Sequence, residues 1–257
     1  MKTKIVLLTL VSVFLLSGTV VTSVAAQPRI VGVNVDDWFK YADITLNWSS
    51  NDPNATFPPS DYEWLAEMNE TEWELLSIVD VSATNITSQI TMHYKNGTEE
   101  TSGGYVDVDT GGGENATFMV ISADLNANDT IYTSPEWSDY KINETIFRTY
   151  PDSGRETNHI NITGEYSYTM NETQHYYYYA MNFYWDRPTG ILLEESFEHI
   201  NQTGELLTTW SFLLRITESN IWVIPEFPTW TSTLLILIVL TVAIVFYKRR
   251  LPKTSIH

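Results

Sequence analysis

Cysteine is absent from all 257 residues. Its absence excludes disulfides, thiolate nucleophiles and zinc sites built on cysteine. A phosphate-binding loop is also missing, because Gly111-Gly112-Gly113 is not followed by Lys-Ser or Lys-Thr. No Gly-x-Ser-x-Gly elbow occurs, and the histidines are scattered along the chain. The sequence therefore predicts a protein that is not an enzyme.

Basic residues are scarce between the two apolar ends of the chain. The sequence holds 14 basic and 32 acidic residues, and six of the basic ones lie in or beside the apolar ends. The segment 27–230 keeps eight basic against 32 acidic side chains, a net charge near −24. Such a field repels nucleic acid and anionic lipid headgroups and attracts cations. We therefore expect no nucleic-acid partner.

The N-terminus has the pattern of an export signal. Two lysines precede an apolar run from Ile5 to Leu16, and a tract of small residues ends at Ala26. This order predicts a secretory signal peptide over 1–26, with cleavage after Ala26. An uncleaved signal anchor is the alternative, although the apolar run is short for a full membrane span.

The C-terminal region predicts a membrane anchor. Residues 230–247 contain no charged side chain, and Lys248-Arg249-Arg250 follow at once. This pattern predicts a transmembrane helix over 230–247 and a cytoplasmic basic tail over 248–257. The large segment 27–222 would then lie outside the cell, joined to the helix by a proline-rich stalk over 223–229. The predicted location is the cell membrane, with a single span and the C-terminus in the cytoplasm.

The stalk contains a short motif, Pro225, Glu226 and Phe227, directly before the apolar span and the basic tail. This order resembles the PEF-type C-terminal sorting signals of archaeal surface proteins, over about the last 30 residues. The resemblance implies processing near the motif by an archaeosortase-like enzyme and transfer to another anchor. Pro228 stands where versions of the signal have glycine, and the alternative is a rigid stalk above an ordinary anchor.

Asn-x-Ser/Thr triplets are far more frequent than composition predicts. With 17 asparagines and about a fifth of the chain Ser or Thr, roughly three or four triplets are expected by chance. There are 11, and ten carry Thr. They predict N-glycosylation at exposed positions. Dense N-glycosylation of a chain without cysteine is typical of an archaeal cell surface. The asparagines are Asn47, Asn54, Asn69, Asn85, Asn96, Asn115, Asn128, Asn143, Asn161, Asn171 and Asn201.

Alternation of apolar and polar residues predicts a mainly β domain over 27–222. The clearest strand covers 85–94 and ends at Asn96-Gly97, a dipeptide that favours a two-residue hairpin turn. A second alternating stretch starts at 159, and the stretches 176–185, 191–200 and 206–217 follow it. The turn 186–190 separates the first two of these three. The sequence thus predicts a long antiparallel meander in the C-terminal half.

Helix signals are few. Ser60 and Glu63 have the spacing of a capping box, and Leu65 and Met68 follow at helical spacing, which predicts a short helix over 61–69. The segment 118–125 is apolar at too many positions to be assigned to either a helix or a strand. The predicted fold is therefore a large curved antiparallel sheet with one or two short helices, and a β-sandwich is the alternative. In hairpin order the sheet resembles the LolA-type lipoprotein carriers.

One acidic turn has the oxygen spacing of a calcium loop. Asp124, Asn126 and Asn128 stand at alternate positions, but the loop lacks its glycine and its closing glutamate. A solvated turn is the simpler interpretation, and a weak calcium site is the alternative.

The stretch 176–185 carries aromatic residues on both faces. We expect Phe183 and the residues that alternate with it to face the core, because burial of each contributes roughly 1.5–3 kcal/mol. The other face carries Tyr176, Tyr178 and Tyr184, which predict either packing or a ligand groove.

These observations predict an anchored surface glycoprotein with a binding, adhesive or envelope role and envelope glycans as partners. The alternative is a carrier or sensor of a hydrophobic ligand, which an aromatic-lined cavity would favour. Hydrolysis of an envelope polymer, with Glu194, Glu195 or Glu198 as carboxylates, is a third option.

Overall fold

The computed structural model of the protein describes residues 28–59, 62–151 and 153–221. These residues form one ten-stranded antiparallel sheet with very little helix. All ten strands are joined by hydrogen bonds into the same sheet, so the described residues do not form two separate sheets. The strands are β1 (Trp38–Ser50), β2 (Thr71–Ser82), β3 (Asn85–Tyr94), β4 (Glu99–Asp107), β5 (Gly113–Glu114), β6 (Glu144–Tyr150), β7 (Ser153–Met170), β8 (Thr173–Asp186), β9 (Leu192–Thr203) and β10 (Leu206–Ser219).

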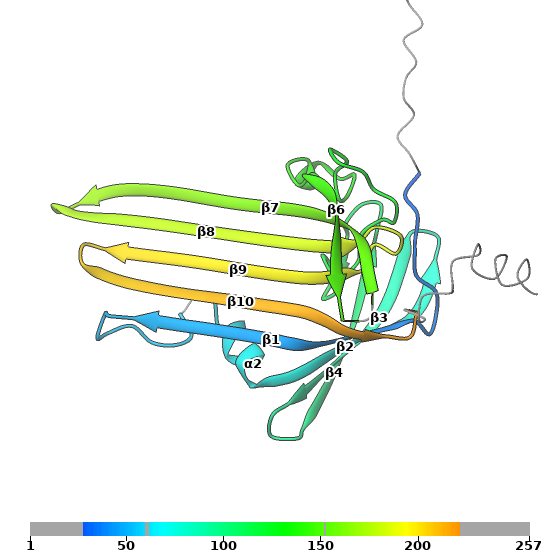
Figure 1. Cartoon of the computed structure of the whole chain (residues 1–257), viewed down its shortest axis with the longest axis horizontal. Coiled ribbons are helices and arrows are strands. Elements are labelled where there is room, and N and C mark those ends of the chain that lie inside the picture. The colour runs from blue at the N-terminus through cyan, green and yellow to red at the C-terminus, as the bar shows by residue number, and fades with distance from the viewer. Residues whose placement is uncertain (1–27, 60–61, 152, 222–257) are drawn as a thin grey trace, which may run out of the picture.

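The strand order across the sheet is β5-β4-β3-β2-β1-β10-β9-β8-β7-β6. The predicted C-terminal meander is confirmed, because β7 to β10 follow one another as neighbours in space and in sequence. The first strand pairs with the last, and this pairing joins the N-terminal hairpins to the meander. The turns after β7 and after β9 lie at the same end of the sheet, opposite the end of β10 (Figure 1).

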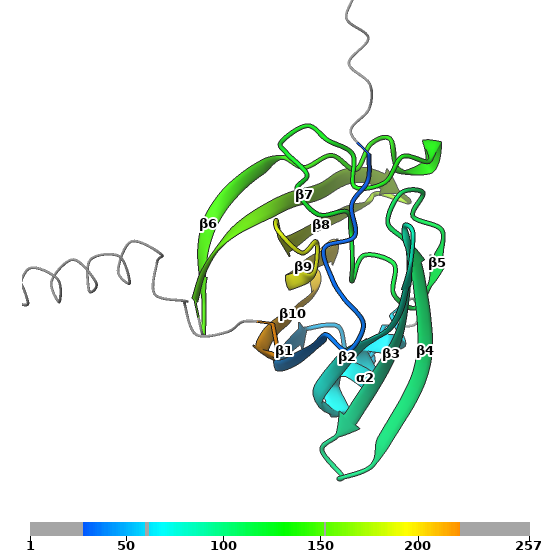
Figure 2. The ribbon, with the colours of Figure 1, turned by 90° about the vertical axis from the view of Figure 1, so that its right-hand side faces the viewer.

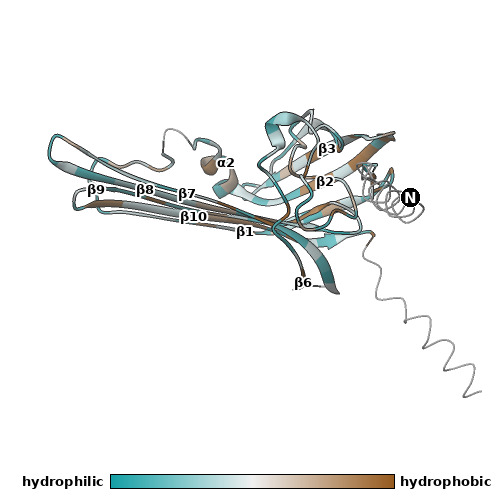
Figure 3. Ribbon diagram, turned by 90° about the horizontal axis from the view of Figure 1, so that it is seen from above, coloured by the Kyte–Doolittle hydropathy of each residue, from teal (hydrophilic) through white to brown (hydrophobic). Residues whose placement is uncertain are grey.

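The sheet bends where β1 meets β2. Register shifts interrupt the pairing of β1 with β10 between Lys40 and Asp43, and β1 pairs with β2 only over Trp38–Tyr41. A β-bulge kinks a strand and increases its twist, so the pairing changes direction here. Figures 2 and 3 show the result: the long strands form a blade, and β2 to β4 turn away from it as a second wing.

The only α-helix in the described part of the chain, α2 (Trp64–Glu70), lies on the side toward which this wing turns (Figure 3). The sequence predicted a short helix over 61–69, and the observed helix buries Leu65 and Met68, the two residues at helical spacing. The predicted capping box is not observed: the helix begins at Trp64, and Glu63 at its N-cap makes no side-chain hydrogen bond there. Ser60 lies outside the described residues. A 3-10 turn, η1 (Pro135–Trp137), is the other helical element among the residues that the structure describes.

The segment between β5 and β6 packs between the two wings and occupies part of the space there. Its residues 119–123 are buried without forming a strand, because their backbone groups pair individually with other segments, such as Ile121 N with Gly190 O at 2.9 Å. Tyr132 lies under this segment and donates to the carbonyl of Val120 at 3.0 Å. The segment 118–125, which the sequence left open between helix and strand, is therefore irregular, and its residues 119–123 belong to the core.

The hairpin at Asn96-Gly97 differs in detail from its prediction. Tyr94 N bonds to Thr98 O, and Gly97 N bonds to Tyr94 O, so three residues rather than two form the loop. Gly97 takes the left-handed conformation with φ of 83°. This is the loop in which a turn is followed by a glycine bulge.

No helix among the described residues is long and apolar enough to cross a membrane. The predicted signal peptide, the stalk with Pro225, Glu226 and Phe227, and the span over 230–247 lie outside the described residues.

Candidate functional site

The bend of the sheet creates a cavity of about 560 Å³ between the two wings. We call it the acidic cavity. One wall comes from β2, β3 and β4, the other from β8, β9 and β10, and α2 and the segment after β5 close its sides. Its lining residues are Trp64, Glu67, Met68, Glu74, Ile90, Met92, Glu100, Ser102, Asn115, Thr117, Phe118, Met119, Phe183, Leu192, Glu195, Phe212 and Leu214.

Two of the glutamates stand on the apolar side of the sheet. Glu74 occupies the same face of β2 as buried Leu76, and it pairs in register with Tyr41 at the bend. Glu195 pairs in register with Phe183 and Leu214, two apolar lining residues. The alternation of these strands, whose period is two, brings both carboxylates to the inner face.

The surroundings of these carboxyl groups raise their pKa. Burial first, and then the charge of Glu67, raises the pKa of Glu74 from 4.5 to about 7. Burial first, and then the charge of Glu74, raises the pKa of Glu195 to about 7. The same two carboxylates, after burial, raise the pKa of the Tyr41 hydroxyl, which donates to Leu192 O at 2.8 Å.

The aromatic wall of the cavity is held by ring contacts. Phe118 stacks on Phe183 with centroids 5.2 Å apart, and Phe183 stacks on Trp185 at 5.6 Å. The Trp185 indole donates to the carbonyl of Phe118 at 2.7 Å, which fixes the irregular segment against β8. Trp64 meets Phe212 edge to face at 5.2 Å on the opposite side of the cavity.

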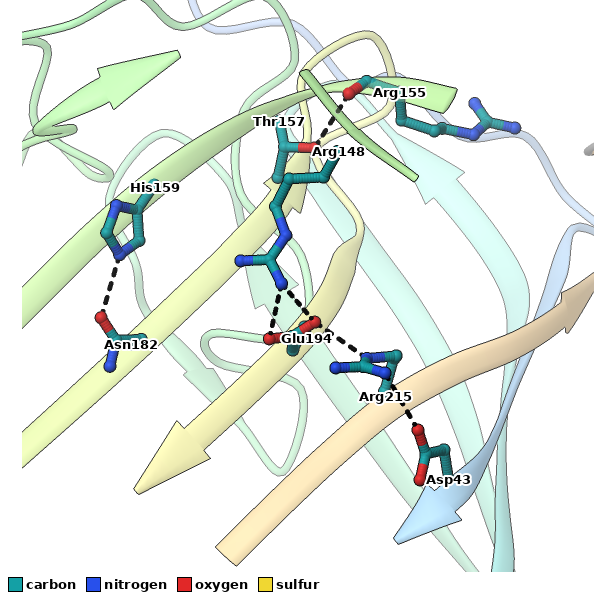
Figure 4. A network of polar contacts seen from close by, with 8 residues as sticks. All are labelled: Asp43, Arg148, Arg155, Thr157, His159, Asn182, Glu194 and Arg215. Carbon is teal, nitrogen blue, oxygen red and sulfur yellow. Dashed lines mark hydrogen bonds and ion pairs between the residues drawn. The ribbon is translucent and has the colours of Figure 1, made fainter. Parts of the chain in front are cut away.

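The outer face of the sheet carries a separate polar cluster. Glu194, only 5% exposed, accepts from Arg148 at 3.0 Å and from Arg215 at 2.9 Å, and Arg215 also reaches Asp43 at 3.2 Å (Figure 4). The Arg148 guanidinium also lies 3.9 Å from the centre of the Tyr184 ring. We call this group the Glu194 cluster. It joins five strands, β1, β6, β8, β9 and β10, and both carboxylate oxygens of Glu194 already accept from arginines.

The residues 176, 178 and 184 lie on the face of β8 that points away from the acidic cavity. The predicted alternation of this strand is confirmed near its end, where Phe183 and Trp185 are buried in the core and Tyr184 is only half-buried. Farther along β8 it is not, because Tyr177, Tyr179 and Met181 are half-buried, like Tyr176 and Tyr178 on the other face. Tyr184 is stacked on His159 at 4.3 Å and covered by Arg148. No pocket described in the structure brings Tyr176, Tyr178 and Tyr184 together, and a groove on them stays a prediction.

The predicted calcium residues form a local hydrogen-bonded turn. Asp129 accepts from Asn126 N at 2.8 Å, and the Asn126 side-chain oxygen accepts from the Arg187 guanidinium at 3.1 Å. A cation at Asn126 would meet the positive charge of this arginine. The geometry favours the solvated turn, with Asp124 and Asn128 both exposed in left-handed conformations.

The glycosylation asparagines lie at the surface. Ten of the 11 are exposed, and Asn69 is half-buried. Asn161 illustrates the pattern, because it stands on β7 beside buried Ile160 and points to the other face. The geometry therefore leaves room for glycans at these positions.

Reasoning from sequence missed Glu74, Phe118 and Phe212 and did not single out Glu195 from its acidic neighbours. A signal was present: Glu74 shares its face of the strand with Leu76 and Ile78, and Glu195 shares its face with Phe197. A carboxylate on the apolar side of an alternating stretch is unusual, because burying a charge costs free energy. What the sequence did not provide was the bend that brings the two strands to one cavity.

No protein-family model matches the chain, and no curated protein matches it in sequence.

Proposed function

We propose that this chain is a membrane-anchored protein of the cell surface whose outer domain binds a small hydrophobic molecule in the acidic cavity. The observation that carries the proposal is the cavity itself, because it is lined mainly by aromatic, methionine and aliphatic side chains. Its volume falls in the range of about 300–1,000 Å³ that is usual for ligand pockets. A bent sheet with a helix on its inner side is also in keeping with the resemblance to LolA-type carriers.

The anchor and the glycans are supported by sequence features. The uncharged run 230–247 followed by three basic residues supports a single span, and the export signal over 1–26 supports an outside location. The exposure of the triplet asparagines supports glycosylation of the outer domain. The Pro-Glu-Phe motif supports processing by an archaeosortase-like enzyme.

An adhesive or envelope role is the second candidate. Apolar side chains are exposed near the turns at the free end of the blade, including Tyr166, Tyr168 and Met170, each at least half exposed. Such a patch suits contact with another surface component. The polymer-hydrolase option has less support, because Glu194, Glu195 and Glu198 are not brought together: Glu195 lines the cavity, while Glu194 and Glu198 lie on the outer face.

The test blocks the cavity and leaves the rest of the surface alone. Ser102 lines the cavity from β4, and its neighbour Thr101 lies on the other face, where it bonds to Thr91 at 3.1 Å. The full chain is purified from its native membrane in a maltoside detergent, and its bound small molecules are identified by native mass spectrometry. We expect a bound hydrophobic molecule in the unmodified chain and in Thr101→Trp, and its loss in Ser102→Trp.

Absence of any bound molecule from the unmodified chain, together with normal cell-surface assembly of Ser102→Trp, would overturn the binding proposal in favour of the adhesive role.

A further inference from the structure

The acidic cavity has an uneven charge. Glutamates reach it from four elements, α2, β2, β4 and β9, and no lysine, arginine or histidine of the described residues lines it. Tyr94 donates to Glu67 at 2.7 Å and to Glu100 at 3.3 Å, so these two carboxylates have a partner near the rim. Glu74 and Glu195 lie deeper and accept no hydrogen bond from any described residue.

The contrast with the neighbouring residue Glu194 is informative. Glu194 is buried to a similar extent as Glu74, with 5% and 6% exposure, but two guanidinium groups compensate its charge. Buried polar groups are nearly always hydrogen-bonded, and buried charges are nearly always paired. Glu74 is the exception, because it lines the cavity and no positively charged side chain in the described part of the chain pairs with its carboxylate.

A positively charged ligand would neutralise these carboxylates, and the rest of the lining indicates which kind of cation fits. Trp64, Phe118, Phe183 and Phe212 present aromatic rings to the cavity, and aromatic rings attract organic ammonium groups. A bare calcium ion requires six to eight oxygen ligands, whereas most of this lining is apolar. Among the described residues, no three of the Asp, Glu and His side chains lie close enough together to hold a metal ion.

We propose that the ligand of the acidic cavity is an apolar organic cation whose ammonium group is neutralised by Glu74 and Glu195. This inference rests on the proposed binding function and adds the chemical class of the ligand. The apolar body of the ligand packs against Phe183, Phe212 and Met119, and its charge replaces the missing partner of the two carboxylates. Anionic molecules of the same size are excluded by the four glutamates.

The experiment compares three soluble probes of one size by isothermal titration calorimetry, using the full chain in an uncharged maltoside detergent. The probes are benzyltrimethylammonium, neutral benzyl alcohol and benzenesulfonate. We expect the cation to bind at least about tenfold more tightly than the alcohol at about pH 8, a difference near 1.4 kcal/mol, and the sulfonate not to bind. Glu74→Gln and Glu195→Gln should each remove most of the preference for the cation.

Glu198→Gln is the matched control, because this exposed residue stands on β9 and points to the outer face. It should bind all three probes as the unmodified chain does. Lowering the pH from about 8 to about 5 should weaken binding of the cation, because Glu74 and Glu195 then take up protons. Binding of the alcohol should not change. The other titratable groups facing them are Glu67, Glu100 and Tyr41, and Tyr41 keeps its proton throughout.

The outcomes separate the two proposals. Equal binding of the cation and the alcohol, unaffected by Glu74→Gln, would overturn this inference and leave the hydrophobic binding function standing. Binding of calcium chloride alone that depends on both glutamates, with no binding of benzyltrimethylammonium, would overturn it in favour of a metal site. Failure of every probe to bind would count against the binding function as well.

Discussion

Glu194 and Glu195 are adjacent in the chain but have opposite electrostatic surroundings. The first points outward between two arginines, and the second points inward into an apolar cavity. The pleat of the strand alone produces this difference, because successive side chains alternate between faces. At the scale of single residues, the face of β9 that a carboxylate occupies therefore decides how much free energy its ionisation costs.

Replacing Glu74 measures the free-energy cost of an ionised carboxylate in the apolar cavity. Its pKa is raised from 4.5 to about 7, so between these values the unfolded chain releases a proton that the folded chain retains. The free energy of unfolding therefore falls as the pH rises from about 4.5 to about 7. Glu195, whose pKa is also raised to about 7, contributes to the same fall. Glu74→Gln should therefore make the fall smaller, by the share that Glu74 contributes, and raise the free energy of unfolding at about pH 8 by up to about 3 kcal/mol.

Urea unfolding at about pH 4 and about pH 8 measures the effect, with Glu198→Gln as the control. The gain should vanish at the lower pH, where Glu74 is protonated in both states. A gain of the same size at both pH values would mean that packing, rather than ionisation, is responsible.

The two faces of β8 give a second prediction. Phe183 is 6% exposed and stacked between Phe118 and Trp185. Phe183→Ala should lower the free energy of unfolding by about 3–5 kcal/mol, because it leaves a void among these rings. Tyr178→Ala, on the half-buried outer face, should cost clearly less. Thermal and urea unfolding of both variants would reveal a reversed ranking if the faces were wrongly assigned.

At the scale of elements, the turn between β8 and β9 sets the geometry of the cavity wall. Gly190 has a φ of 74°, and a Cβ there would lie 2.0 Å from the carbonyl oxygen of Ile121. Gly190→Ala should therefore destabilise the chain by more than about 1 kcal/mol, from the backbone conformation together with the clash. Gly103→Ala, with open space around its Cβ, is the control and should change the urea midpoint very little.

The elements themselves were largely predictable from sequence. The strand β3 has the bounds that its alternation predicted, and Leu65 and Met68 anchor the short helix as expected. These features depend on neighbours in the chain. The bend at Lys40 to Asp43 was not predictable, because it depends on two register shifts against a strand more than 170 residues away. The cavity depends on that bend, and so the sequence could not predict that Glu74 and Glu195 line the same cavity.

At the scale of the whole molecule, the distribution of Asn-x-Thr triplets predicts a glycan coat. Ten exposed asparagines are spread over strands and turns on both wings. Intact-mass and peptide mass spectrometry of material from the native host should find several of them occupied. Asn69, half-buried at the end of α2, should be the least occupied of the 11. An unmodified mass for native protein would contradict the prediction.

Orientation in the membrane is a further prediction for the whole chain. The basic residues after the apolar run should remain in the cytoplasm, because they resist translocation. Protease added to intact cells should therefore digest the segment 27–222 and spare the tail 248–257. Epitope tags at the two positions, read by blotting, would show the reverse pattern if the chain were inserted the other way round.

The length of the blade has a consequence for what the molecule displays. Strand β10 runs 14 residues from Leu206 to Ser219, a distance of roughly 45 Å at about 3.3 Å per residue. If the chain is tethered to a membrane through the residues after 221, the turns after β7 and after β9 would therefore lie at the end of the blade that is farthest from the membrane. Tyr166, Tyr168 and Met170 near that end would be the first side chains met by anything that approaches the cell.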